Sequence, residues 1–200
     1  MNTLKINSPK KIVIFASGSG TNAENIIRYF ENSEVVRVVA VFSNKPSAKV
    51  LIRAHKLNIK SFCFERDSFY KSDEVLNILK DLNPDLIVLA GFLWLFPSKI
   101  LNAFPGKVIN LHPALLPNFG GPGMYGEHVH NAVIDQKQQE TGITIHYVNE
   151  NYDEGQTIFQ TSIPVASTDT PKSLAEKIHD LEYRHFPEVI KNLLEKQTLD

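Results

Sequence analysis

The sequence predicts an α/β fold, a single Rossmann-like domain with a mostly parallel twisted sheet, helices on both faces and antiparallel strands near the C-terminal end. Short apolar runs, typical of strands buried on both faces, alternate with stretches whose apolar residues recur at helical spacing. The 200 residues are 42% hydrophobic, which suffices for one full core. After about residue 140 the alternation stops, and two strand-like runs follow each other without room for a helix.

The first part of the chain contains five expected strands joined by expected helices. The strands are residues 12–16, 35–42, 61–64, 86–90 and 107–111. The helices lie near residues 23–30, 48–57, 75–82 and 97–102. Because parallel strands joined through helices form right-handed crossovers, this order places helices on both faces of the sheet.

The C-terminal part predicts a different arrangement. Residues 142–148 and 156–165 read as two strands, and the short polar gap between them predicts an antiparallel pair. A long helix is expected over residues 171–195, bent at Pro187. We expect one domain over residues 1–200, with residues 1–10 as a loose N-terminal extension.

Composition excludes several classes of function. A net charge of −1 gives no basis for general nucleic-acid binding. The lone Cys63 allows no intrachain disulfide and no cysteine-based zinc site. No apolar run approaches the roughly 20 residues that cross a bilayer, and no signal-peptide core precedes the first strand. We therefore expect a cytoplasmic protein without nucleic-acid or membrane partners.

A turn rich in Gly and Ser follows the first expected strand and could hold a phosphate. The run Ser17-Gly18-Ser19-Gly20-Thr21-Asn22 allows close backbone approach, and the helix after it offers unbonded N–H groups to an anion. Ala23 replaces the last glycine of the dinucleotide motif, and the Walker lysine is missing. The alternative is an ordinary tight turn in which Thr21 or Asn22 caps the helix.

The fifth expected strand ends in Asn110-Leu111-His112, followed by Pro113. Asn110 and His112 are two residues apart, so both side chains leave a strand on the same face. An amide that can stabilise an oxyanion then stands beside an imidazole that exchanges protons near neutral pH, a combination suited to acyl-type transfer. Asp153 could orient that imidazole, although an acid in a loop is, taken alone, more often a solvated turn residue, and Glu154 is a neighbouring candidate.

Two further segments leave their role open. Residues 116–126 are rich in Gly and Pro and could form a substrate-contacting lid or a surface excursion. His128 and His130 lie two apart in what looks like a helix and so point roughly 200° apart, which does not make a chelate. No other metal-ligand pattern is present, and no serine-nucleophile elbow follows a strand, so we expect no metal site.

Together these motifs resemble the phosphoribosylglycinamide formyltransferase family, folate-dependent enzymes of purine biosynthesis. The resemblance spans residues 11–194. It rests on the Ser-Gly-Ser-Gly-Thr-Asn loop, Leu-Ala-Gly-Phe at 89–92, Asn-Leu-His-Pro-Ala-Leu-Leu-Pro at 110–117 and the loop around Asp153. The third segment is typical of folate-dependent formyl transferases and hydrolases, and the first indicates the glycinamide ribonucleotide branch.

The resemblance implies a one-carbon group transferase with two small-molecule substrates. It would move the formyl group of 10-formyltetrahydrofolate to the amine of N1-(5-phospho-D-ribosyl)glycinamide in de novo purine (IMP) biosynthesis. The amine would attack directly, with Asn110, His112 and Asp153 as the catalytic trio that stabilises the tetrahedral intermediate and moves protons. No cofactor would be tightly bound, because the folate is a co-substrate. The resemblance implies a monomer or a homodimer.

The same resemblance implies binding residues. The substrate phosphate would contact Gly20, Thr21 and Asn22, and the rest of the ribonucleotide would contact Gly121, His179 and Glu182. Folate would contact Arg66, Leu93, Trp94, Leu95, Phe96, Asn110, Val148 and Asn149. Trp94 stands where many relatives carry an arginine, so this wall is expected to be more apolar.

Two other functions remain open on the sequence alone. One is a related folate enzyme, a formyltetrahydrofolate hydrolase or a methionyl-tRNA formyltransferase, although 200 residues leave no room for their added domains. The other is a non-catalytic module that binds a nucleotide or sugar phosphate, for which the Asn110, His112 and Asp153 set would be unnecessary.

Overall fold

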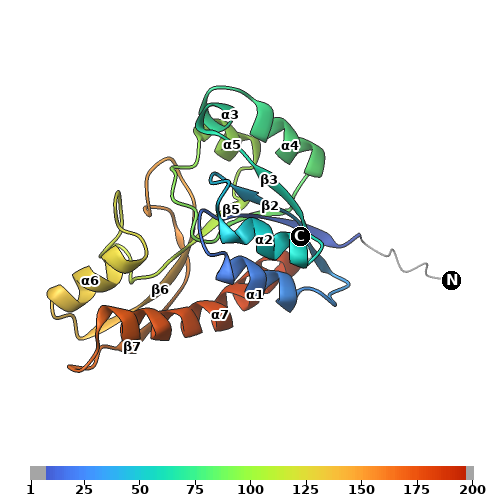
Figure 1. Cartoon of the computed structure of the whole chain (residues 1–200). Coiled ribbons are helices and arrows are strands. Elements are labelled where there is room, and N and C mark those ends of the chain that lie inside the picture. Colours follow the sequence, from blue (N-terminus) through green and yellow to red (C-terminus); the bar gives the residue numbers. More distant parts are fainter. Residues whose placement is uncertain (1–7, 197–200) are drawn as a thin grey trace.

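The computed structural model describes residues 8–196, and their strands form one sheet of order β3-β2-β1-β4-β5-β6-β7 (Figure 1). The strands are β1 (Lys10–Phe15), β2 (Val36–Ser43), β3 (Lys60–Cys63), β4 (Leu86–Leu89), β5 (Val108–His112), β6 (Glu140–Tyr147) and β7 (Thr157–Pro164). The first five are mutually parallel, whereas β6 runs antiparallel to β5 and β7 antiparallel to β6. The predicted fold class is confirmed.

Seven helices connect or follow the strands in the described part. They are α1 (Thr21–Tyr29), α2 (Lys49–Lys56), α3 (Arg66–Tyr70), α4 (Glu74–Leu82), α5 (Ser98–Ala103), α6 (Glu127–Asp135) and α7 (Pro171–Lys196). The short α3 had no periodic signal of its own, because one turn of helix is too short to show one. Of the expected N-terminal extension, residues 1–7 lie outside the described residues, and Lys10 already belongs to β1.

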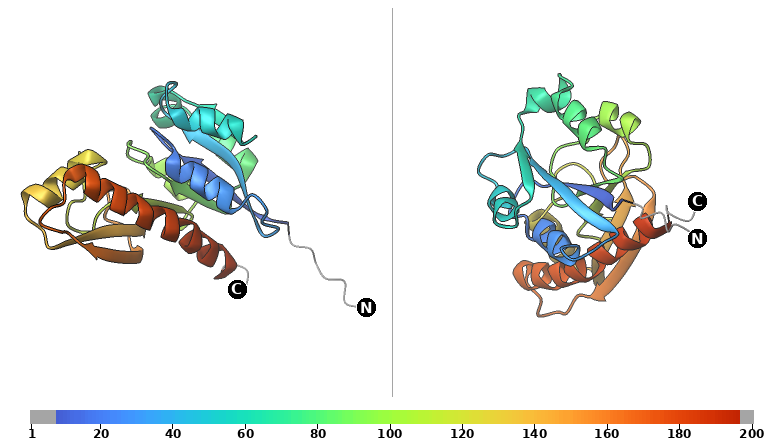
Figure 2. Two further views of the ribbon diagram at one scale, coloured as in Figure 1. Left: turned by 60° about the horizontal axis from the view of Figure 1, so that its bottom comes forward. Right: turned by 90° about the vertical axis from the view of Figure 1, so that its right-hand side faces the viewer.

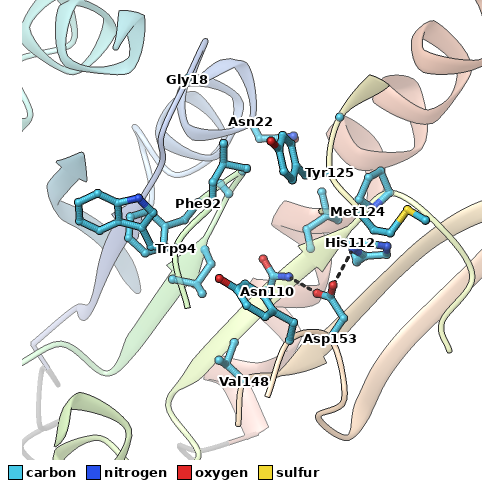
Figure 3. Close-up of a pocket in the computed structure, with 18 of the residues that line it drawn as sticks. Gly18, Asn22, Phe92, Trp94, Asn110, His112, Met124, Tyr125, Val148 and Asp153 are labelled. Atoms are coloured by element: carbon cyan, nitrogen blue, oxygen red, sulfur yellow. Dashed lines mark hydrogen bonds and ion pairs between the residues drawn. The ribbon is translucent and has the colours of Figure 1, made fainter. Parts of the chain in front are cut away.

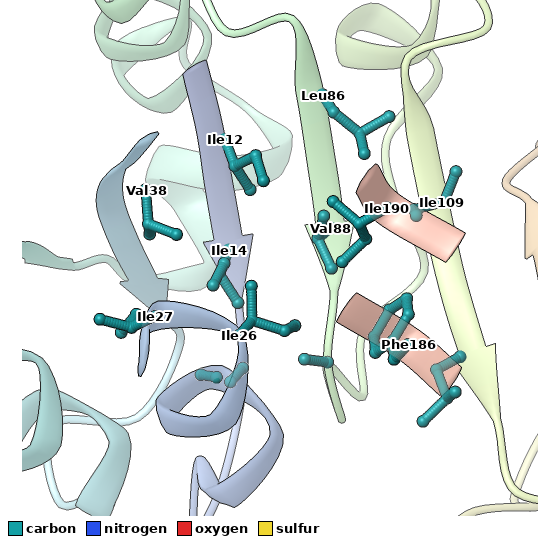
Figure 4. Packing of buried hydrophobic residues seen from close by; sticks show 14 of the residues in the cluster. Ile12, Ile14, Ile26, Ile27, Val38, Leu86, Val88, Ile109, Phe186 and Ile190 are labelled. Carbon is teal, nitrogen blue, oxygen red and sulfur yellow. The ribbon is translucent and has the colours of Figure 1, made fainter. Parts of the chain in front are cut away.

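The two faces of the sheet carry separate apolar layers. Ile12 and Ile14 of β1 pack with residues of α1, α2 and α7, whereas Val13 and Phe15 pack with residues of α3, α4 and α5. Figure 4 shows the first layer, where Phe186 and Ile190 of α7 lie over β4 and β5. Burial of side chains of this size stabilises the fold by roughly 1.5–3 kcal/mol each.

Helix α7 contacts elements from both the first and the last part of the chain. It packs on α1 and α6 and against β6 (Figure 2). Pro187 lies inside it and is buried, as are Phe186 and Ile190. The carboxyl ends of β1, β4 and β5 border a cavity that residues of α6, of α7 and of the loop after β6 also line. No helix among residues 8–196 has the length and apolar character that a membrane span requires.

Candidate active site

A cavity of about 570 Å³ lies at the carboxyl ends of β1, β4 and β5. Open parallel sheets bind ligands at this edge. Its lining comes from segments that are distant in sequence: residues 18–22, 89–96, 110–113, 121–126 and 151–153, with further side chains from α6 and α7. Figure 3 shows the Gly18 loop and the Phe92–Trp94 wall on one side, and His112 and Asp153 on the other.

The turn after β1 delivers the N-terminus of α1 to this cavity. Gly20 has φ 73°, and a Cβ there would lie 2.4 Å from the Val50 side chain, so only glycine fits. Gly20 is the N-cap residue of α1, and no side chain caps the helix. The alternative in which Thr21 or Asn22 caps α1 is therefore wrong, and the first N–H groups of the helix stay available to an anion.

The loop after β4 forms an apolar wall of the cavity. Leu93, Trp94, Leu95 and Phe96 all line it, as the resemblance implied for a folate wall. Two side chains hold this loop by its backbone. The Ser17 hydroxyl accepts the Leu93 N–H at 3.0 Å, and the Tyr70 hydroxyl donates to the Leu95 carbonyl at 2.8 Å.

Asn110, His112 and Asp153 meet at the centre of the cavity. The Asp153 Oδ2 atom lies 3.5 Å from His112 Nδ1, and Asp153 Oδ1 accepts a hydrogen bond from Asn110 Nδ2 at 3.3 Å (Figure 3). His112 is 3% exposed, so its contact with Asp153 is shielded from water. Glu154 instead accepts a hydrogen bond from Asn151 at 2.7 Å and lines no part of this cavity. Of the two neighbouring acids, only Asp153 faces the imidazole.

His146 is a fourth member of this cluster that the sequence analysis missed. It lies opposite Asn110 in the β5–β6 ladder and is 2% exposed. Its Nδ1 donates to the Tyr147 carbonyl at 2.8 Å, and its Nε2 lies 3.2 Å from Asn110 Nδ2. Nε2 also lies 3.6 Å from Asp153 Oδ1. A polar residue at every second position of an expected strand, Thr144 then His146, was the available signal.

The electrostatics of the trio favour an ionised Asp153. Burial would raise the pKa of its carboxyl, but the hydrogen bond with His146, the charge of His112 and the Gly121 N–H outweigh it and hold the pKa below its usual value. Burial lowers the pKa of His112 below its usual value, and this effect exceeds the opposing attraction of Asp153. His112 is therefore predominantly neutral at pH 7 before substrate binds, although a neighbouring carboxylate taken alone favours the charged ring.

The glycine-rich loop touches the trio directly. The Gly121 N–H donates to Asp153 Oδ2 at 3.0 Å, and the Phe119 carbonyl accepts from His112 Nε2 at 2.7 Å. Phe119 adopts a positive φ of 57°, a conformation that is uncommon for a non-glycine residue. In this arrangement the Nε2 proton points at the loop, so the loop has to shift before that proton can reach a ligand.

A polar cluster lies where α1, α6 and α7 meet. Glu182 is 5% exposed and accepts from Asn22 Nδ2 at 2.8 Å, while His179 Nε2 lies 4.0 Å from its Oε2 atom. Burial raises the pKa of Glu182. The buried His130, which the sequence analysis considered only as a metal ligand, has a pKa lowered to about 4 by burial and by the nearby His179. Among residues 8–196, His130 Nδ1 and Asn22 Oδ1 find no hydrogen-bond partner.

The structure thus brings together most of the residues singled out from the sequence. The cavity lining includes Gly20, Thr21, Asn22, Leu93, Trp94, Leu95, Phe96, Asn110, His112, Gly121, Val148, Asp153, His179 and Glu182. It includes neither Arg66 nor Asn149. Asn149 is exposed, and Arg66 lies behind Trp94, over whose ring its guanidinium stacks. No cluster of three metal-ligating side chains occurs in the described part of the chain.

Comparison with known proteins identifies related sequences and folds. Residues 10–190 match the family model described as formyl transferase. A phosphoribosylglycinamide formyltransferase of Bacillus subtilis (strain 168) is 37% identical over 92% of this chain and 95% of its own length. The chloroplastic phosphoribosylglycinamide formyltransferase of Arabidopsis thaliana is 35% identical over 94% of this chain. The match covers 66% of the length of the Arabidopsis protein. The crystal structure of phosphoribosylglycinamide formyltransferase from Bacillus halodurans superimposes with a TM-score of 0.84 at 36% identity, covering 94% of this chain and 97% of the other.

Proposed function

The chain belongs to the formyl transferase family, and we propose that it transfers the formyl group of 10-formyltetrahydrofolate to the primary amine of N1-(5-phospho-D-ribosyl)glycinamide in purine biosynthesis. The observation that carries this proposal is the meeting of Asn110, His112 and Asp153 between an anion-binding helix end and an apolar wall. A protein that only binds a ligand could use the helix end or the apolar wall. It would have no use for the acid–base residues between them.

The acceptor occupies the side of the cavity formed by α1 and α7. Its phosphate binds the N–H groups at Gly20, Thr21 and Asn22, where the helix dipole also favours negative charge. The sugar then lies toward Glu182, His179 and Gly121. This orientation directs the amine toward Asp153 and His112.

The donor occupies the opposite side as a consumed co-substrate. Its pterin packs against the wall of residues 93–96 and Val148, with the formyl group beside Asn110. An apolar wall with a few fixed polar groups is the usual composition of a site for a flat heterocycle. The backbone bonds from Ser17 and Tyr70 to this loop keep the wall in place.

The reaction proceeds by direct attack of the amine nitrogen on the formyl carbon. The carbonyl π pair moves to oxygen, which becomes negative, and the nitrogen becomes positive. Asn110 Nδ2 and His112 stabilise that oxygen, a contribution of about 3 kcal/mol for each donor of this kind. The Asn110 bonds to Asp153 and His146 are long, at 3.3 and 3.2 Å, so a small shift of the Asp153 loop releases one amide hydrogen.

Proton movement completes the transfer. The negative oxygen raises the pKa of His112, so the ring gains a proton as the intermediate forms. This proton leaves the positive attacking nitrogen and reaches His112 through water and Asp153, whose carboxylate, ionised again, stabilises the resulting imidazolium. His112 then delivers the same proton to N10 of the folate, the oxyanion returns its electron pair to carbon and the C–N10 bond breaks, which leaves formylated acceptor and tetrahydrofolate. General acid–base catalysis of this kind accelerates a reaction by a factor of roughly 10²–10⁴.

A spectrophotometric assay with both substrates tests the proposal. Deformylated folate should form only when the ribonucleotide is present, in equal amount to formylated ribonucleotide. Folate formed at the same rate without the ribonucleotide would indicate a hydrolase, and no turnover with ribonucleotide binding intact would indicate a binding module.

A further inference from the structure

The turn of residues 17–20, directly after β1, is held by two hydrogen bonds from α2. The Val50 N–H donates to the Gly18 carbonyl at 3.2 Å, and Arg53 Nε donates to the Ser19 carbonyl at 2.8 Å. The turn lines the cavity, whereas no residue of α2 does. Both carbonyls of the turn therefore point toward α2, the side from which the ligand does not come.

The direction of these carbonyls fixes the direction of two N–H groups. In a planar trans peptide, the N–H group points opposite to the carbonyl of the preceding residue. The N–H groups of Ser19 and Gly20 therefore face away from α2, and neither donates to a backbone or side-chain acceptor within residues 8–196. They add two donors for an anion to the first N–H groups of α1.

The cavity depends on such backbone donors because its lining lacks a permanent cation. Within the described part of the chain, the side chains that line it include histidines but no lysine and no arginine. A phosphate at the turn is therefore held mainly by N–H groups. Because a hydrogen bond weakens steeply when the donor points away from the acceptor, binding at this place is sensitive to the orientation of the turn.

Arg53 is itself fixed by an acidic residue in the first turn of α1. Its Nη1 atom donates to Glu24 Oε2, and Arg28 Nε donates to Glu24 Oε1 at 2.9 Å. The hydrogen bonds from Arg28 and Arg53 hold the pKa of the Glu24 carboxyl below its usual value. The two arginines thus share one carboxylate, but within residues 8–196 only Arg53 also reaches the turn.

Resting on the proposed function, we propose that Arg53 is a positioning residue of the acceptor site, which turns the Ser19 carbonyl toward α2 and so presents the Gly20 N–H to the substrate phosphate. Arg53 lines no part of the cavity, so it acts through the backbone and not by touching the ligand. The bond from its Nε carries this role. Its charge is largely compensated by Glu24.

The affinities of three variants for the ribonucleotide and for inorganic phosphate, measured by calorimetry, test this role. Arg53→Met removes the donor and should weaken both ligands about tenfold, as expected when one hydrogen bond to a charged group is lost. Arg53→Gln removes the charge but puts an amide N–H₂ group where Nε lies, so it should keep most of the affinity. Arg28→Met removes a charge from the same carboxylate without changing the turn and should bind as the unmodified chain does.

Kinetics and salt dependence distinguish positioning from charge. In Arg53→Met the KM for the ribonucleotide should rise about tenfold while kcat stays nearly unchanged. The loss of affinity should persist at about 1 M salt, where the Debye length is about 3 Å. An equal loss in Arg53→Gln and Arg53→Met, or a loss that disappears at high salt, would mean that the charge alone is responsible and would overturn the inference.

Binding of tetrahydrofolate separates this role from a general effect on the fold, and it should be the same in all three variants. A parallel fall in folate and phosphate binding in Arg53→Met would mean a merely structural role. If the unmodified protein transfers formyl groups and Arg53→Met keeps its affinity for the ribonucleotide, only the role of Arg53 is wrong. If the unmodified protein neither binds the ribonucleotide nor transfers a formyl group, the proposed function fails, and this inference fails with it.

Discussion

The carboxylate of Asp153 lies 3.5 Å from Nδ1 of His112, although the two residues belong to separate parts of the chain. His112 ends β5, the last parallel strand, and Asp153 lies in the loop between β6 and β7. Antiparallel β6 passes His112 at Thr144 and reaches Ile109 at Tyr147, so it ends near the start of β5. The loop after β6 then turns back and brings Asp153 to Asn110 and His112, and this return assembles the Asp153–His112 pair.

Replacing Asp153 with Asn should lower turnover by about 10²–10⁴-fold, because the amide can neither stabilise the His112 imidazolium nor accept a proton. The affinity for the ribonucleotide should change little, since its phosphate binds at the other end of the cavity. Steady-state kinetics and calorimetry measure the two effects. Glu154→Gln is the matched control and should keep its turnover, and an equal loss in both variants would remove Asp153 from the mechanism.

Replacing His146 with Leu should shift the acid limb of the activity profile to higher pH. The hydrogen bond from His146 is a main cause of the lowered Asp153 pKa, so its loss raises that pKa and Asp153 becomes protonated sooner as the pH falls. Turnover at pH 7 should fall on the order of tenfold as Asn110 loses a partner. His55→Leu, an exposed position on α2, should leave the profile in place; an unshifted profile in His146→Leu would contradict the coupling.

Inorganic phosphate should compete with the ribonucleotide for the helix end at Gly20. Gly20→Ala should abolish this competition and destabilise the fold by about 1–3 kcal/mol, because alanine disfavours φ 73° and its Cβ would clash with Val50. Gly18→Ala is the steric control, since no atom lies within 4 Å of a Cβ at that position. Inhibition kinetics and urea unfolding measure both effects, and noncompetitive inhibition by phosphate would refute the assignment of the loop.

His130 should make the folded state less stable as the pH falls. Its folded pKa of about 4 lies below the unfolded value near 6.5, so between these values the unfolded chain binds the proton that the folded chain rejects. The stability contributed by neutral His130 is complete above the unfolded pKa and declines as the pH falls toward the folded one. Because the cavity admits water that screens the charge, the loss between pH 7 and 5 should not exceed about 1–2 kcal/mol.

Urea unfolding at pH 7 and 5 measures this contribution. His130→Gln should show a smaller difference in unfolding free energy between the two pH values than the unmodified chain. His128→Gln, an exposed change on the same helix, should show the unmodified difference. Equal differences in all three proteins would mean that His130 titrates normally.

The strands and helices that could be predicted are those whose residue pattern is contained within the element itself. The runs that became β1 and β4 are apolar throughout because both faces of a parallel strand are covered, and the helices between them repeat apolar residues at 3.6-residue spacing. Asn110 and His112 were recognisable as a pair because side chains two apart on a strand share a face. The Gly20 turn was recognisable because few other sequences permit its backbone.

His146, His130 and the Arg66 stack could not be found in this way, because each depends on a neighbour far away in the sequence. His146 matters only because β6 pairs antiparallel with β5 and sets it opposite Asn110. Burial shifts the pKa of His130, and that burial arises where α6 meets α7. Tyr70 and Trp94 are ordinary aromatic residues until the fold stacks them on Arg66.

The sequence by itself determined the fold class, the glycine-rich turn after the first strand and the pairing of Asn110 with His112 on one face of a strand, since these follow from local periodicity, backbone conformation and side-chain chemistry. Only the tertiary structure decided which of two adjacent acids faces the imidazole, the protonation states of Asp153 and His112, and which cation borders the apolar wall. Those properties depend on burial and on distances of a few ångströms between residues that only the folded chain brings together.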